Sequence, residues 1–228
     1  MAVCSASGCS MVAHQQNAAG VKLYQQGYYA QALQNFQKAT ATDPKDADAL
    51  YNQAATYHRL GKLNNRKEDL SQAESLYNQS LDHNPNNKDC YRALAVLLVD
   101  ENRNDEAQRL LQGWATRSPT SAEPKVEMAR LAEDLGDKQS AKTYLTEALA
   151  INPYEPRALA ALGRINEETG NMQQALVDYE RSLQYDRFQP ELASRVSSLK
   201  ATMGTLVPNV TPPGGSRVVT TPTVAPRY

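Results

Sequence analysis

The chain has 228 residues, 41% of them hydrophobic and 21% charged, so most of it can fold around a sizeable core. Its 24 Lys and Arg nearly cancel its 25 Asp and Glu, which excludes a polybasic protein that binds nucleic acid or adheres electrostatically to an anionic membrane. No apolar run approaches the roughly 20 residues that a transmembrane helix needs, and three Cys and three His are too few and too scattered for a disulfide framework or a zinc site.

Residues 1–12 differ from the body of the chain, and we expect them to be disordered. Ala6-Ser7-Gly8-Cys9-Ser10 is similar to the cleavage site of a bacterial lipoprotein, in which Cys9 would carry the lipid. No basic start and no apolar stretch of about 7–15 residues precedes it, so this signal would require a start upstream of Met1. If Cys9 is lipidated, we expect the protein to be held at a membrane of the bacterial envelope. If Cys9 is not lipidated, we expect it in the cytoplasm.

One repeating period organises the chain from residue 13 to residue 202. Pro85, Pro119 and Pro153 are evenly spaced, and a small residue keeps the same spacing 12 positions upstream of each. Pro44 and Ala32 precede Pro85 and Ala73 by one period plus seven residues, which indicates seven extra residues in the second unit. The small residues of the later units are Ala73, Ala107, Ala141 and Ala175. Such regular spacing is typical of a repeat protein.

The residue pattern of each unit predicts two helices joined by a turn. Tyr29, Ala32 and Phe36 recur at steps of three and four, which places them on one helical face. Dipeptides such as Asp43-Pro44 end each second helix, because the residue before proline is pushed out of the helical region. Glycines at or near the turn supply left-handed backbone angles. These are Gly27, Gly61, Gly136 and Gly170.

The segment from Gly27 to Ala39 (GYYAQALQNFQKA), followed by Pro44, resembles the tetratricopeptide repeat, a helix-turn-helix of about 34 residues. The resemblance implies an all-α fold: a right-handed superhelical solenoid of five helix-turn-helix repeats over 13–202, including a C-terminal capping helix near 191–201. The repeats are expected at 13–46, 47–87, 88–121, 122–155 and 156–189.

Three departures from the repeat pattern carry predictions. The extra residues of the second repeat, between Gly61 and Glu68, predict a longer turn or an extra helical turn. Trp114 stands where the family usually has alanine, so we expect a core residue that splays its helix pair. Arg187 replaces the last expected proline.

Residues 203–228 contain five prolines and no acidic residue, and this Pro/Thr-rich tail is predicted to be disordered.

No group of residues is arranged for catalysis, so the chain is not expected to be an enzyme or to need a cofactor or metal. There is no glycine-rich phosphate loop, nucleophile elbow or metal-binding Cys or His motif. Cys90 falls near a helix start, where a thiol pKa can be lowered, but no His is near it in sequence. A structural role for Cys90 is therefore favoured over a nucleophile.

In tetratricopeptide repeats the first helices line a concave groove, and the family's groove positions can be carried onto this chain. Tyrosine and arginine are the types that contribute most to binding, since they offer broad contact area with a polar or charged tip. A clamp for a partner's C-terminal carboxylate, found in some members, is not expected because Asp89 and Ala93 replace its cations. The candidate groove residues are Asn17, Tyr24, Tyr51, Asn52, His58, Arg59, Arg92, Arg130 and Arg164.

The resemblance implies a non-catalytic scaffold that binds a segment of a protein partner in this groove. Partner side chains are expected against Tyr24 and Tyr51, with arginines pairing with acidic or backbone groups. With a lipid on Cys9, the chain would be similar to envelope lipoproteins that serve pilus or secretion assembly. The alternative is an accessory subunit that recruits substrate for a separately encoded enzyme.

Overall fold

The computed structural model describes residues 6–206, with side chains described for residues 10–203. Within that range the chain forms eleven α-helices and no strand. The helices are α1 (Ala6–Gln25), α2 (Tyr29–Thr42), α3 (Ala47–Asn64), α4 (Lys67–His83), α5 (Lys88–Asp100), α6 (Asn104–Arg117), α7 (Glu123–Asp134), α8 (Lys138–Ile151), α9 (Pro156–Glu168), α10 (Met172–Tyr185) and α11 (Pro190–Leu206).

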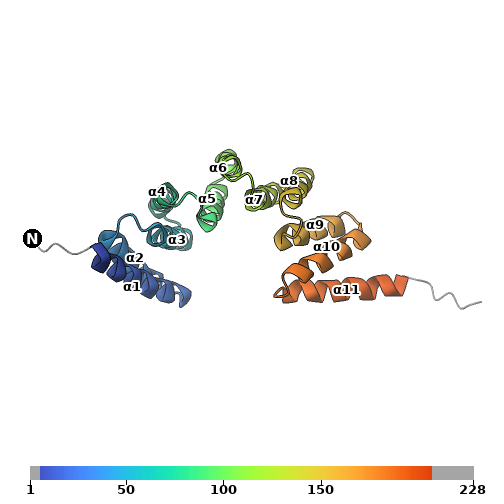
Figure 1. The fold of residues 1–228 in the computed structure, drawn as a ribbon, viewed down its shortest axis with the longest axis horizontal. Coiled ribbons are helices and arrows are strands. Elements are labelled where there is room, and N and C mark those ends of the chain that lie inside the picture. Colours follow the sequence, from blue (N-terminus) through green and yellow to red (C-terminus); the bar gives the residue numbers. More distant parts are fainter. Residues whose placement is uncertain (1–5, 207–228) are drawn as a thin grey trace, which may run out of the picture.

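Successive helices pair into five antiparallel hairpins, and α11 packs on α10 as the last element. The hairpins stack into an arch, with α1 and α11 as its two feet and α6 near its top (Figure 1). The first helices α3, α5 and α7 lie on the inner side of the arch, and α4, α6 and α8 lie on the outer side. The predicted all-α solenoid of five repeats and a capping helix is confirmed.

Local chemistry sets the helix ends as the prolines and Asx residues predict. Asp43, Asn84 and Asn152 each stand at a C-cap, where the backbone N–H donates to the carbonyl four residues earlier. The Asp46 carboxylate caps α3 by accepting from the backbone N–H groups of residues 48 and 49, and Asn87 caps α5 in the same manner. These bonds satisfy backbone groups that a helix end would otherwise leave unpaired.

Two columns of buried residues recur through the repeats and form the core of each hairpin. The small column is fully buried in every repeat, which lets the two helices of a hairpin approach closely. A large residue four positions later fills the space beside it. The small column is Ala32, Ala73, Ala107, Ala141 and Ala175, and the large column is Phe36, Tyr77, Leu111, Leu145 and Tyr179.

The predicted turn role of Gly61 is wrong, because Gly61 lies inside α3. Asn65 takes the left-handed position there, with φ of 52°, and Asn102 does so in the third repeat with φ of 60°. An added Cβ on Gly61 would lie 2.7 Å from Leu70 Cδ2, so close helix packing explains this glycine. The seven extra residues lengthen α3 to 18 residues and α4 to 17, which is the predicted extra helical turn.

Trp114 is a core residue, as predicted, with 3% of its surface exposed. Its indole stacks on the Tyr91 ring, with centroids 4.6 Å apart and the planes 7° from parallel. The Arg117 guanidinium lies over the Tyr91 ring, 5.5 Å from its centroid, and donates to its hydroxyl over 2.6 Å. The two helices of the third repeat also pack less closely than those of the other repeats, consistent with the expected splaying.

Both ends of the solenoid extend beyond the expected bounds of 13 and 202. Helix α1 begins at Ala6, so residues 6–12 are helical where disorder was expected. No proline interrupts them, and adding residues to an existing helix gains one hydrogen bond each. Helix α11 begins at Pro190, three residues after the position at which the repeat's last proline is expected, and continues to Leu206. The predicted tail from 207 onward and the side chain of Cys9 lie outside the described residues.

Within residues 6–206, none of the helices is both long and apolar enough to cross a membrane.

Candidate partner-binding groove

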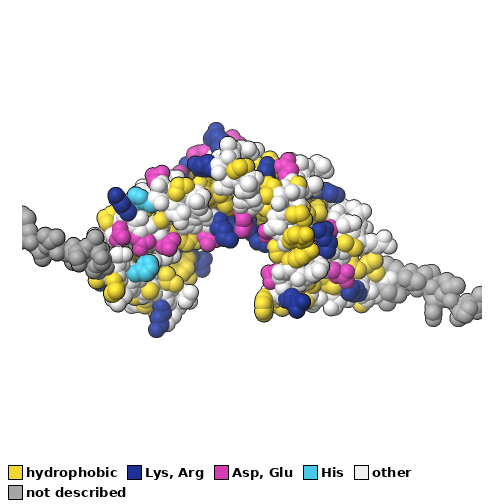
Figure 2. Space-filling view, in the orientation of Figure 1, with side chains coloured by type: hydrophobic (Ala, Val, Ile, Leu, Met, Phe, Trp, Pro, Cys, Tyr) yellow, Lys and Arg dark blue, Asp and Glu magenta, His cyan; other side chains and the backbone are white. Residues whose placement is uncertain are grey.

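The underside of the arch is hollowed, and basic and acidic side chains gather along it (Figure 2). A groove of about 490 Å³ lies there, which we call the main pocket. Side chains from α1, α3, α5, α7 and α9 line it, together with Tyr77 of α4. One first helix from each of the five repeats therefore contributes to a single surface.

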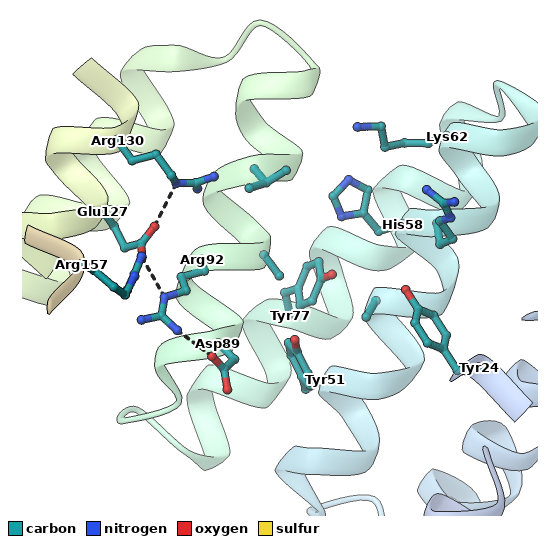
Figure 3. A pocket seen from close by; sticks show the side chains of 14 residues that line it. Tyr24, Tyr51, His58, Lys62, Tyr77, Asp89, Arg92, Glu127, Arg130 and Arg157 are labelled. Atoms are coloured by element: carbon teal, nitrogen blue, oxygen red, sulfur yellow. Dashed lines mark hydrogen bonds and ion pairs between the residues drawn. The ribbon is translucent and has the colours of Figure 1, made fainter. Parts of the chain in front are cut away.

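Aromatic rings form one wall of the main pocket (Figure 3). The Tyr24 ring meets Tyr29 edge-on with centroids 5.0 Å apart, and Tyr51 lies 6.0 Å from Tyr77. Burial raises the pKa of both Tyr24 and Tyr51, so their hydroxyls are neutral at physiological pH. The half-buried rings offer a broad apolar face with a hydrogen-bonding tip.

His58 is held by its neighbours in the wall of the main pocket. Its Nε2 lies 3.3 Å from an Asp100 carboxylate oxygen, to which Lys62 also donates over 2.6 Å. Burial lowers the pKa of His58, and the hydrogen bond to Asp100 only partly opposes that effect. The imidazole is therefore neutral at pH 7 and packs edge-on against Tyr77.

The opposite wall is a network of arginines around the buried carboxylate of Glu127, which is 1% exposed. Arg92 Nε donates to it over 2.7 Å, Arg130 Nε donates over 3.0 Å, and Arg157 donates from a terminal nitrogen. Both Arg92 and Arg157 also pair with Glu123. Repeats three, four and five are thus joined across the groove by charge-assisted hydrogen bonds.

The arginines keep Glu127 ionised despite its burial. Burial alone would raise the pKa of Glu127, but Arg157, Arg130 and Arg92 outweigh it and lower the pKa below its usual value. Among the lining side chains five are cationic and two, Asp89 and Glu127, are anionic. Glu123 and Asp100 pair with three of these cations from beside the lining, so five positive and four negative groups leave the site a net charge of +1, whereas the whole chain carries a formal charge of −1.

The structure brings six of the nine predicted groove residues into the main pocket: Tyr24, Tyr51, His58, Arg59, Arg92 and Arg130. Asn17 and Asn52 do not line it; the Asn52 amide donates to the Asn17 side-chain oxygen over 2.9 Å. Arg164 pairs with Glu133 and lines a separate pocket nearer the C-terminal end.

Sequence reasoning missed Lys62 and Arg157, which both line the main pocket. Arg157 stands one repeat period after Glu123, so the two residues occupy equivalent positions with opposite charge. That periodic charge reversal was a usable signal for an ion pair between repeats. Lys62 carries no such signal, since it lies in the lengthened part of α3.

Cys90 is structural, as the sequence favours. Its side chain is fully buried and Sγ donates to the Tyr77 carbonyl over 3.3 Å. Burial raises the pKa of this thiol to about 12. Within residues 6–206 no cluster of three His, Cys, Asp or Glu side chains is placed to hold a metal ion.

We expect Cys90 to resist modification in a Cys4→Ser, Cys9→Ser background. At pH 8 an aromatic disulfide reagent should react with the native protein at least about 100-fold more slowly than with the urea-unfolded chain, because a thiol with a raised pKa is almost wholly protonated. Absorbance of the released thiolate measures both rates. Equal rates would show that Cys90 is exposed.

Models of known families match three consecutive parts of the chain. A TPR repeat model covers residues 20–61, and two tetratricopeptide repeat models cover residues 66–131 and 126–191. No curated protein sequence matches the chain.

Solved structures with the same fold span most of the chain. TTC0263, a thermophilic TPR protein of Thermus thermophilus, is 24% identical with a TM-score of 0.62, covering 83% of this chain and 99% of its own. The pilF protein of Pseudomonas aeruginosa is 18% identical with a TM-score of 0.59, covering 89% and 95%. MamA of Desulfovibrio magneticus RS-1 is 16% identical with a TM-score of 0.52, covering 78% and 96%.

The stacked hairpins and their continuous inner surface define a helical-repeat scaffold for protein–protein interaction. The chain belongs to the tetratricopeptide-repeat family, whose fold is in general non-catalytic. Proteins of this family bind protein or peptide partners.

Proposed function

We propose that the main pocket binds an extended, acidic segment of a partner protein. The observation that carries this proposal is the pairing of an aromatic wall with a pre-ordered cationic wall inside one groove. Tyr24 and Tyr51 would bury apolar side chains of the segment, and the arginines would donate to its carboxylates and backbone carbonyls.

Pre-ordering favours binding because little side-chain entropy remains to be lost. Arg130 meets Glu127 through Nε, which leaves its two terminal nitrogens toward the groove (Figure 3). Arg59 is exposed and rests over the Tyr29 ring, 5.6 Å from its centroid. These two guanidinium groups flank the pocket from α7 and α3, so an extended chain between them would meet donors on both sides.

Three fluorescein-labelled peptides of about 12 residues test this proposal. They share proline and leucine positions, which favour an extended chain, and differ only in carrying Glu, Gln or Lys at the remaining positions. We expect the Glu peptide to bind most tightly in fluorescence anisotropy. Arg59→Glu should weaken it by about tenfold, equivalent to about 1.4 kcal/mol of binding free energy.

Arg109→Glu is the matched control, since Arg109 is exposed on α6 outside the groove and the change in net charge is the same. We expect its affinity for the Glu peptide to stay within about twofold of wild type. A Lys peptide that binds as tightly as the Glu peptide, or equal losses in both variants, would refute the proposed groove.

A further inference from the structure

A second pocket of about 490 Å³ lies at the C-terminal end of the concave surface, where the capping helix forms one side. We call it the cap pocket. Residues of α9 and α11 line it, together with Tyr179 of α10 and Gln189. Capping helices of repeat proteins shield the last hairpin from water, and here Val196 and Leu199 are buried for that purpose. Another face of α11 is left to line the pocket.

Three arginines dominate the cap pocket: Arg157, Arg164 and Arg195. Each is about half exposed, with 43%, 55% and 56% of its side chain accessible. The lining contains a single carboxylate, Glu191. The pocket is therefore rich in guanidinium N–H donors and open to a ligand, although carboxylates beside the lining balance the charge of its arginines.

Each of these arginines is oriented by a carboxylate on a preceding repeat. Arg195 donates from Nε to Glu167 over 3.0 Å and also from one terminal nitrogen, which leaves its other terminal nitrogen for a ligand. Arg164 meets Glu133 through one terminal nitrogen only. The Tyr179 hydroxyl donates to Glu167 over 2.9 Å and fixes that carboxylate in turn.

The cap pocket continues the main pocket because Arg157 lines both. Apolar side chains of Ala161 and Leu192 lie among the lining residues, so the cap pocket repeats the combination of apolar surface and fixed guanidinium groups. Neighbouring packed helices are about 10 Å apart. The surface from α3 to α11 therefore extends about 40 Å, a span of about 12 extended residues.

We propose that the cap pocket is a second anionic subsite that binds the continuation of the partner's acidic segment. The inference rests on the proposed function and makes the ligand bipartite: one part lies in the main pocket and a second acidic part lies against Arg164 and Arg195. The capping helix then contributes directly to partner binding. The spare arginine donors favour this occupant, since a carboxylate accepts stronger, charge-assisted hydrogen bonds than a backbone carbonyl or water does.

Two labelled oligoglutamates of different length test the bipartite site. Hexaglutamate spans about 20 Å and occupies one pocket, whereas hexadecaglutamate spans about 53 Å and reaches both. We expect anisotropy to show at least about tenfold tighter binding of the longer peptide, through the effective concentration that tethering creates. In the Arg164→Gln, Arg195→Gln variant this gain from length should fall to about twofold.

The double variant leaves Glu133 and Glu167 without their arginines and could loosen the cap, so a second variant tests the proposal with the fold intact. Glu191 is exposed at the start of α11, and Glu191→Gln removes the one carboxylate among the cap-pocket residues. We expect it to strengthen hexadecaglutamate binding by about threefold and to leave hexaglutamate within about 1.5-fold, since repulsion at the far end acts only on the longer chain.

The two proposals fail differently. If Arg59→Glu weakens both peptides while Glu191→Gln and the arginine double variant leave the gain from length unchanged, the main pocket stands and the cap subsite is refuted. If neither peptide responds to Arg59→Glu, the main pocket itself is refuted. A gain from length that persists in both cap-pocket variants and vanishes in Arg109→Gln would place the second contact outside the cap pocket and overturn the inference.

Discussion

Glu127→Ala should lower the free energy of unfolding by about 3 kcal/mol, because it leaves three arginines without their shared acceptor in a partly buried site. Glu127 is 1% exposed and joins Arg92, Arg130 and Arg157. The estimate is at the lower end for a broken buried ion pair, since the arginines remain partly solvated. Urea unfolding followed by far-UV circular dichroism measures the loss.

The same change should alter the acid sensitivity of the protein. The pKa of Glu127 is lowered in the folded state, so its carboxylate contributes stability above the unfolded value of about 4.3 and loses it as the pH falls through the folded pKa. The difference in stability between wild type and Glu127→Ala should therefore be largest at pH 7 and shrink below about pH 4. A constant difference across this range would contradict the assigned charge.

Glu147→Ala is the matched control for Glu127→Ala. Glu147 pairs with Lys125 over 2.6 Å, but 45% of its side chain is exposed. A solvated ion pair contributes little, so we expect a loss below about 1 kcal/mol. Equal losses in the two variants would mean that the arginine network does not join the repeats.

Trp114→Ala should cost about 4 kcal/mol and divide the unfolding transition. Removing a buried tryptophan loses apolar burial and leaves a cavity, and here it also removes the stacking partner of Tyr91. Solenoid stability is approximately a sum of repeat and interface terms. Weakening the central repeat should therefore let the first two repeats and the last two repeats unfold separately, as a broadened or two-step transition in urea.

Trp114→Phe provides the control for this prediction. A phenyl ring keeps an aromatic face against Tyr91 and most of the buried volume, so we expect a loss of about 1–2 kcal/mol and a single transition. Far-UV circular dichroism serves for both variants, because Trp114 is the one tryptophan of the chain. A single, sharp transition in Trp114→Ala would show that the third repeat does not couple the two halves.

Much of the candidate groove was predictable because helix periodicity places the first-helix residues on one face. Tyr24, Tyr51 and Arg92 were expected in the groove and do line the main pocket. The prediction was weaker for their interactions: Arg92 was expected to be available to a partner, and the structure shows it pairing with Asp89, Glu123 and Glu127. Helical periodicity predicts the face of the helix on which a side chain lies, but it does not predict which neighbouring side chain pairs with it.

The end of the chain shows the same limit. Leu192, Val196 and Leu199 have helical spacing, which predicts a capping helix from sequence. Nothing in that spacing indicates that Arg195 on the same helix reaches back 28 residues to Glu167 and lines a pocket with Arg157. The cap pocket became visible only when α9, α10 and α11 were placed together.

The amino-acid sequence by itself determined the repeat, the helix ends and the buried alanine column, because these depend on hydrogen bonds, caps and steric limits within a few residues. Only the tertiary structure decided most of the ion pairs across the groove. The Arg157–Glu123 pair follows the period, but Arg92, Arg157 and Arg164 also reach carboxylates over 35, 30 and 31 residues, close to the period but not equal to it. These sequence separations depend on the rotation of each hairpin relative to the preceding hairpin and on the extension of each arginine side chain. Neither is set by the few residues on either side of the arginine.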